Sequence, residues 1–374
     1  MIRPLVDQIA ARLPDHIIHL STMTETGQRK AGQTVGRRGG SFFFPLDFIL
    51  IQSLAVSRLR PKSVILCETE LWPNFLWLCQ LLGLPVFLVN ARLSTKSFPY
   101  YRALGFLFRP LIRNFSLIAC QTEGDLERFR RIVGGRENMV VAGNMKYDAM
   151  AEAPSPGQWS STRPALGLGP DQTVMVAGST REGEEEMVLR AWQEAVSKAR
   201  SPYKNRLIIA PRHPERFQRV AGNLKERGLD FARRSAGEGF TDERRIMLWD
   251  TVGELTTAYA VGDIAFVGGS LVPVGGHNPL EPAAMGLPVA FGPYMENAAE
   301  SAEVLIKAGG AVQVGSAEEL AEVLGAWMAD GEKRRRIGIS ARRAVESMRG
   351  AARRTAEMVA ERIKNRKVIR NNNQ

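Results

Sequence analysis

The stretch of this chain with the most chemical content is residues 266–291, FVGGSLVPVGGHNPLEPAAMGLPVAF. Glycine has no Cβ, so a loop with two glycine pairs lets a ligand approach the backbone closely. The candidate ligand-contacting residues of this loop are Gly268, Gly269, Ser270 and Gly276. An ordinary strand-to-helix crossover, in which the glycines only make the turn, is the alternative.

The second half of the stretch predicts a phosphate site. We expect a helix to open at Asn278 with Pro279 in its first turn. Such a helix start presents free N–H groups and the positive end of the helix dipole to an anion. Glu281, one turn into that helix, can accept hydrogen bonds from the hydroxyls of a ribose.

Two carboxylates and a lysine in the first half follow apolar runs. Glu68 and Glu70 stand between a predicted strand and a predicted helix, and such a pair can bind sugar hydroxyls or act as acid or base. A compatible alternative is that Thr69 caps the helix while both acids favour its dipole. Lys146, in GNMKYD, can neutralise a phosphate or carboxylate as charge develops. A lone surface lysine is the alternative there.

Two more segments in the second half follow predicted strands. Ser179 and Thr180 suit phosphate oxygens at a strand-to-helix turn, unless one of them only caps the acidic helix start. Arg212 offers a planar, permanently charged fork to a phosphate or carboxylate. His213 beside it is better suited to donate a hydrogen bond than to bind a metal. The four histidines have no suitably spaced partners, so we expect no metal site.

Parallel sheets are needed to position these segments. Apolar strands alternate with helical segments such as 47–60 and 122–132, a pattern typical of parallel sheets covered on both faces. The expected strands are 17–21, 41–44, 63–67, 85–90, 116–119 and 139–142, followed by 173–177, 206–210, 246–249, 264–267 and 289–291.

The chain is long enough for two domains. The Pro-, Gly- and Ser-rich residues 151–170 predict a linker between a first domain, 1–150, and a second domain, 171–374. Two doubly wound, Rossmann-like α/β domains face each other across a cleft at the carboxyl ends of their strands, where ligands bind. Glycosyltransferases of the GT-B architecture and several nucleotide-sugar epimerases have this layout.

Charge narrows the choice of partners. The formal net charge is +11, and residues 1–150 carry a surplus of 8 of these charges. A basic first half favours an anionic substrate or an anionic lipid surface. No nucleic-acid partner is expected, because the chain has no zinc-finger spacing, RNA-binding aromatic motif or long Lys/Arg run. The longest apolar run, 75–89, is short for a bilayer, so no membrane span is expected.

Six blocks together closely resemble the 3-deoxy-D-manno-octulosonic acid (Kdo) transferases, the lipid A glycosyltransferases of Gram-negative bacteria. They are ETELWPN (68–74), NARLS (90–94), GNMKYD (143–148), PRHPERF (211–217), DTVGEL (250–255) and FVGGSLVPVGGHNPLEPA (266–283). The resemblance implies the GT-B fold and transfer of Kdo from CMP-Kdo to a lipid A precursor in lipopolysaccharide biosynthesis. It also implies that no metal or other cofactor is used. The expected location is peripheral, on the anionic cytoplasmic face of the inner membrane.

The family's site residues carry over position by position. Its CMP-binding positions fall on Pro211, Arg212, Val252, Gly253, Glu254, Asn278, Pro279, Leu280 and Glu281. Glu68 and Lys146 match catalytic positions regarded in the family as stabilising the transition state. Helix N-termini and arginine or lysine can hold the charge of the departing phosphate in place of a metal cation.

The sequence departs from the family at its start. The family's catalytic base is a glutamate directly before the helix that matches residues 2–13, so we expect this glutamate and the first strand of the first domain to lie upstream of Met1. Glu25 does not match that motif. Without its first strand the first domain would leave backbone groups unpaired and would fold poorly, and activity would suffer.

Two alternatives to a Kdo transferase stay open. One is another two-domain nucleotide-sugar enzyme, either a UDP-sugar transferase or an epimerase. The other is a non-catalytic nucleotide-binding scaffold.

Overall fold

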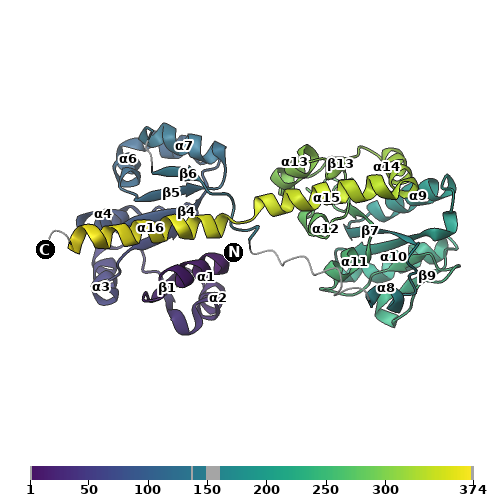
Figure 1. The fold of residues 1–374 in the computed structure, drawn as a ribbon, viewed down its shortest axis with the longest axis horizontal. Helices are drawn as coiled ribbons and strands as arrows, with labels where there is room; N and C mark the ends of the chain where they lie inside the picture. Colours follow the sequence, from purple (N-terminus) through teal and green to yellow (C-terminus); the bar gives the residue numbers. More distant parts are fainter. Residues whose placement is uncertain (1, 136–137, 149–160, 372–374) are drawn as a thin grey trace. The chain divides into compact units, whose positions relative to one another are not determined.

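A computed structural model describes residues 2–135, 138–148 and 161–371 of the chain. The chain divides into two compact units, which are shown in Figure 1. One consists of Met1–Ala151 and Met348–Gln374, and the other of Glu152–Ser347.

The first unit holds two parallel sheets. β1 (Ile18–Thr22) pairs with β2 (Gly39–Phe43), and a separate sheet has the order β3 (Val64–Cys67), β4 (Val86–Ala91), β5 (Leu117–Cys120), β6 (Met139–Val141). Its described helices are α1 (Arg3–Arg12), α2 (Glu25–Val35), α3 (Ile49–Leu59), α4 (Pro73–Leu81), α5 (Phe98–Ala103), α6 (Gly105–Arg113), α7 (Glu123–Val133) and α16 (Ala351–Asn371). β4 and β5 are buried along their whole length, as expected where helices cover both faces of a parallel sheet.

The C-terminal helix α16 packs against the first unit. Its small residues Ala352, Ala356 and Ala360 share a buried cluster with Leu5 and Ile9 of α1. Figure 1 shows this helix lying along the four-stranded sheet. The domain division predicted from the sequence differs here, because it assigns residues 348–374 to the second domain. The alanines of α16 are buried against residues far away in the sequence, and this packing places the helix in the first unit.

The second unit is one seven-stranded parallel sheet covered by helices. Its strand order is β13-β12-β11-β7-β8-β10-β9. The strands are β7 (Thr173–Thr180), β8 (Asn205–Pro211), β9 (Phe231–Arg233), β10 (Ile246–Leu248), β11 (Ile264–Val267), β12 (Val289–Phe291) and β13 (Ala311–Gln313). The described helices are α8 (Thr162–Ala165), α9 (Glu184–Ser197), α10 (Phe217–Glu226), α11 (Leu255–Val261), α12 (Leu280–Ala284), α13 (Ala299–Lys307), α14 (Ala317–Ala329) and α15 (Gly331–Met348).

This strand order contains a topological switch point. From β7 the chain proceeds to β8 and then to β9 at the edge of the sheet, returns to β10 between them, and then crosses to β11 on the other side of β7. Ligands of doubly wound sheets bind at the carboxyl ends of the strands where the order reverses. The ends of β7, β8 and β11 are therefore the expected binding edge of this unit.

The predicted elements agree closely with the observed ones. Every predicted strand is present with its ends within three residues of the prediction, whereas β9 and β13 were missed. Residues 151–160 of the predicted linker lie outside the described residues. Leu166 and Leu168, near its end, instead pack into the core of the second unit. No helix in the described ranges combines the length and apolarity needed to cross a membrane.

Candidate active site

Basic side chains meet at the switch point of the second unit. Arg181 follows β7, Arg212 and His213 follow β8, and His277 lies in the loop after β11. Nε of Arg181 donates to Nε2 of His277 over 3.2 Å, and its Nη1 is hydrogen-bonded to Nε2 of His213. The two imidazole rings therefore hold the Arg181 guanidinium in one orientation.

The two arginines of this cluster lack a described carboxylate partner. Among the described residues, neither Arg181 nor Arg212 forms an ion pair, whereas nearby Arg216 makes a bidentate pair with Glu185 at 2.6 and 3.0 Å. An arginine that is not ion-paired with a protein carboxylate keeps its donors and charge available to an anionic ligand. The edge formed by β7, β8 and β11 is suited to a phosphate.

Protonation in the cluster is set by burial and by these arginines. Burial, followed by the charges of Arg181 and Arg212, lowers the pKa of His277 to about 4. The ring is therefore neutral near pH 7 and accepts the Arg181 hydrogen bond at Nε2. Glu281 lies in the same electrostatic environment: burial raises its pKa, opposed by a hydrogen bond from Asn278 and by the charge of Arg212.

The helix predicted to open at Asn278 begins later than expected and is short. α12 starts at Leu280, with Pro279 at the N-cap position, and has five residues. Oδ1 of Asn278 accepts from the Leu280 amide over 3.2 Å, which uses one of the free N–H groups. So short a helix has a weak dipole. The prediction that the helix opens at Asn278 was wrong, and the arginines are the stronger anion-binding groups.

The loop that contains the first glycine pair, Gly268 and Gly269, binds a protein carboxylate. Glu184 is fully buried and accepts from the amides of Gly269, Ser270 and Leu271 over 2.6, 2.8 and 2.8 Å. It also accepts from the Arg181 amide over 2.9 Å. Glu184 thus fixes the glycine loop and the start of the segment carrying Arg181.

Close packing against neighbouring atoms explains two more glycines. A Cβ on Gly268 would lie 2.5 Å from the carbonyl oxygen of Ser179, and one on Gly276 would lie 2.4 Å from the sulfur of Met295. Ser270 is buried, and its Oγ accepts from the Gly292 amide over 2.8 Å. These contacts match the alternative in which the glycines make the turn.

Neither hydroxyl predicted as a possible helix cap plays that role. The N-cap of α9 is Gly183, without a side-chain cap. Thr180 is fully buried and donates from Oγ1 to Oε1 of Glu185 over 2.8 Å. Ser179, the last residue but one of β7, has a left-handed φ of 58°. The capping prediction was wrong, and the Thr180 hydroxyl is already engaged by the protein.

Two segments with predicted CMP contacts lie at the same sheet edge. Pro211 ends β8, and the residues 252–254 follow β10, the neighbour of β8. Val252 is 75% exposed, and Gly253 has a φ of 84°. Glu254 accepts from Nε of Arg234 over 3.2 Å and from Oγ1 of Thr251 over 2.9 Å.

In the first unit, Glu68 and Lys146 are both exposed at the carboxyl edge of the sheet. Glu68 follows β3 in the left-handed conformation, with a φ of 65°. Lys146 follows β6, with Nζ 4.9 Å from the ring centroid of Tyr147. Sparsely populated backbone conformations are concentrated at functional sites.

The helix after Glu68 is capped from elsewhere in the chain. Asp47 accepts from the amides of Asn74 and Phe75 at the start of α4, over 3.2 and 3.1 Å. Thr69 instead donates to the carbonyl oxygen of Arg92. The prediction that Thr69 caps this helix was wrong.

Comparisons with known proteins agree with this geometry. A family model described as 3-deoxy-D-manno-octulosonic-acid transferase (kdotransferase) matches residues 1–149. The 3-deoxy-D-manno-octulosonic acid transferase of Haemophilus influenzae is 34% identical over 358 residues, covering 95% of this chain and 82% of the relative. The chain belongs to the Kdo transferase family. As a Kdo transferase it is a glycosyltransferase enzyme of lipopolysaccharide core biosynthesis.

Solved structures agree on the fold. Anabaena HepE in complex with UDP has a TM-score of 0.56 and 14% identity, covering 97% of this chain and 96% of that one. A glycosyltransferase from Rickettsia africae has a TM-score of 0.56 and 11% identity, covering 97% and 94%. The two doubly wound α/β units of this Kdo transferase have the GT-B fold.

Sequence reasoning missed two residues of interest. Arg181 was visible in the segment after β7, but its partners His213 and His277 lie 32 and 96 positions away. Asn90 belongs to the NARLS block and has a left-handed φ of 51°, which no local pattern predicts. In the described part of the chain, no three His, Cys, Asp or Glu side chains are grouped as a metal site would require.

Proposed function

We propose that this enzyme transfers Kdo from CMP-Kdo to a lipid A precursor, with the donor held at the ends of β7, β8 and β11. The observation that carries this proposal is the cluster of Arg181 and Arg212, neither of which forms an ion pair with a described carboxylate. The phosphate that links cytidine to Kdo is the anion this cluster fits. Two guanidinium groups stabilise the negative charge that collects on CMP as the sugar leaves.

The remaining donor contacts follow from the family positions. Pro211 and Arg212 stand at the end of β8, where Arg212 can bind the phosphate, and the Glu281 carboxylate can accept from a ribose hydroxyl. Burial, which raises the pKa of Glu281, makes such a hydrogen bond strong because few water molecules compete for it. Asn278, Pro279, Leu280 and the loop Val252–Glu254 complete the proposed nucleotide site.

On the first unit, Glu68 and Lys146 act on the sugar and acceptor. The Lys146 ammonium is exposed and carries a charge that can stabilise an anionic group of the acceptor or donor at the transition state. The exposed Glu68 carboxylate can stabilise the positive charge that develops on the Kdo ring. Both roles come from the family positions, and the strained backbone at Glu68 supports its role.

The acceptor is a lipid, and α3 offers a surface for a membrane. Leu50 is 82% exposed and Phe48 is 62% exposed, and Ile51 and Leu54 are also exposed. Exposed apolar patches of this kind mark membrane or protein contacts. Arg58 and Arg60 at the end of the helix add charge that attracts anionic headgroups. We propose that α3 contacts the anionic cytoplasmic face of the inner membrane.

A direct assay tests the proposal. Purified protein is incubated with CMP-Kdo and a lipid A precursor in detergent micelles, and the acceptor mass and CMP release are both followed. The proposal requires an acceptor heavier by whole Kdo residues and an equal amount of CMP. Tighter binding of UDP than of CMP would favour a UDP-sugar enzyme. CMP binding with no turnover would favour a nucleotide-binding scaffold.

A further inference from the structure

Glu68 and Lys146 follow strands at opposite edges of one sheet. The order β3-β4-β5-β6 separates the ends of β3 and β6 by three strand intervals. At about 4.8 Å per interval, this is about 14 Å. Side chains that act on one substrate therefore need their loops to be brought closer together.

Two consecutive residues of β4 hold the segments that carry these side chains. The amide of Glu68 donates to the carbonyl oxygen of Val89 over 2.9 Å. The next residue, Asn90, accepts at Oδ1 from the amide of Met145 over 3.0 Å. Met145 directly precedes Lys146, so the segment after β6 returns past β5 to the end of β4.

The backbone at Asn90 is shaped for this contact. Its φ of 51° lies in the left-handed region, which among non-glycine residues asparagine tolerates best. The pairing of β4 with β5 shifts register between Leu88 and Ala91, around Asn90. Such bulges change the direction of a side chain and are common next to active sites. Asn90 is 1% exposed, so its side chain makes its contacts inside the protein.

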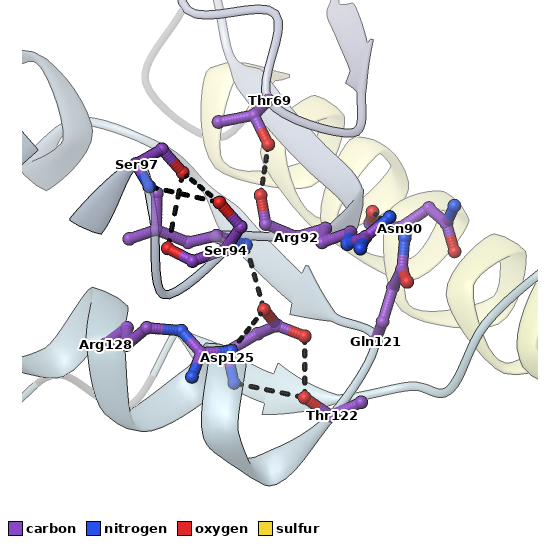
Figure 2. Close-up of polar contacts among 10 residues, drawn as sticks. Thr69, Asn90, Arg92, Ser94, Ser97, Gln121, Thr122, Asp125 and Arg128 are labelled. Atoms are coloured by element: carbon purple, nitrogen blue, oxygen red, sulfur yellow. Dashed lines mark hydrogen bonds and ion pairs between the residues drawn. The ribbon is translucent and has the colours of Figure 1, made fainter. Parts of the chain in front are cut away.

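Neighbouring contacts hold this turn in place, as Figure 2 shows. The carbonyl oxygen of Asn90 accepts from Nε2 of Gln121 over 3.0 Å. Two residues later, the carbonyl oxygen of Arg92 accepts from Thr69, which ties the β4 loop to the loop after Glu68. The Leu93 amide donates to Oδ1 of Asp125 over 2.8 Å.

Asp125 is itself held by three further hydrogen bonds, two with Thr122 and one with Arg128. It accepts from Oγ1 of Thr122 over 2.6 Å and from Nη2 of Arg128 over 2.8 Å, while its own amide donates to Thr122 (Figure 2). The loop after Asn90 is thus anchored to the start of α7. These anchors leave Asn90 little freedom to relax its strained backbone.

From these contacts we infer that Asn90 is a positioning residue, which sets the place of Lys146 relative to Glu68. This inference rests on the catalytic roles proposed for Glu68 and Lys146. Asn90 is buried, so we expect no contact between its side chain and the substrate. It acts through the Met145 amide, and its loss frees the Lys146 segment.

The placement itself is tested by hydrogen exchange in the full-length protein. Asn90→Gly keeps a backbone suited to positive φ and removes the acceptor oxygen. We expect the Met145 amide to exchange about 10-fold or more faster in this variant, with the strand amides of Leu88 and Ile118 unchanged. Asn90→Asp keeps an oxygen for the Met145 amide and should retain slow exchange. Unchanged Met145 exchange in Asn90→Gly would refute the positioning role.

Kinetics test the consequence. A misplacement of about 1 Å can cost about 100-fold in rate, so Asn90→Gly should lower kcat by up to this factor with KM for CMP-Kdo within about twofold. In a Lys146→Ala background the same change should cost less than about threefold, because both act through one group. If the kcat loss of the double variant equalled the product of the two single-variant losses, the inference would be contradicted. Full activity of Lys146→Ala alone would instead refute the role proposed for Lys146, while the exchange result stands independently.

Discussion

Arg181 donates from Nε to Nε2 of His277 over 3.2 Å, across the ends of two neighbouring strands, β7 and β11. A neutral imidazole is an unusual choice of partner for a guanidinium, which most often pairs with a carboxylate. A carboxylate would neutralise Arg181, whereas imidazole orients it and leaves its charge available. The structure therefore holds a fixed cation ready for an anionic ligand.

Removing either arginine of the cluster should weaken CMP binding. Each charge-assisted hydrogen bond to the phosphate is worth about 1.5–3 kcal/mol, so Arg181→Ala and Arg212→Ala should each raise Kd about 10-fold or more in calorimetry. Glu281→Ala should weaken binding through the ribose by a similar factor. The control is Arg219→Ala, which removes an exposed ion pair with Glu182 and should leave Kd unchanged. Wild-type affinity in all three site variants would mean that CMP binds elsewhere.

The low pKa of His277 predicts a pH dependence of stability. The folded ring titrates at about 4 and an unfolded one near 6.5, so between these values the unfolded chain binds more protons. The free energy of unfolding should therefore fall as pH decreases from 6.5 to 4, and this contribution should level off below 4. His277→Gln should lose that part of the slope. Thermal unfolding at four pH values compares the two proteins. The same dependence of stability on pH in both would contradict the burial of a neutral His277.

Glu184 should be the most sensitive acidic position of the second unit. Glu184→Gln replaces one acceptor oxygen by an NH₂ group that faces backbone amides, which leaves buried donors unpaired. We expect a loss of about 3 kcal/mol of unfolding free energy. Glu186→Gln on the same helix breaks only an exposed pair with Arg227 and should cost less than about 1 kcal/mol. Denaturant unfolding measures both, and equal losses would show that the Glu184 contacts do not support the loop.

The apolar face of α3 should govern vesicle binding. Burying a leucine side chain is worth about 1.5–3 kcal/mol, so Leu50→Glu with Leu54→Glu should weaken binding to anionic vesicles about 10-fold or more. Ile339→Glu on α15, also an exposed apolar position, serves as the matched control. CMP affinity should be unchanged in both proteins. Cosedimentation provides the measurement. Undiminished vesicle binding by the α3 variant would contradict the proposal that α3 contacts the membrane.

Most of the fold could be predicted because buried parallel strands leave continuous apolar runs. β9 and β13 were not predicted, because each is a three-residue edge strand that ends in a polar residue, Arg233 or Gln313, and so has no continuous apolar run. The assignment of α16 to the first unit was not predicted for a different reason. Its alanines fit against α1, but nothing in an alanine-rich helix specifies its partner.

The site was predictable at the level of strand ends, but its pairings were not. Arg212 and Glu281 lie at the switch-point edge that the alternating pattern predicted. The cap of α4 comes from Asp47, which contacts Asn74 from 27 positions away, so Thr69 looked like the better candidate. The role of Glu184 likewise depends on amides more than 80 positions distant. Contacts between residues so far apart in the sequence cannot be predicted from the local spacing of residues.

The most direct test of the central claim is a crystal structure with bound CMP. We predict that the phosphate lies within hydrogen-bonding distance of both Arg181 and Arg212, and that a ribose hydroxyl lies against Glu281. A CMP phosphate that contacts neither arginine would contradict it.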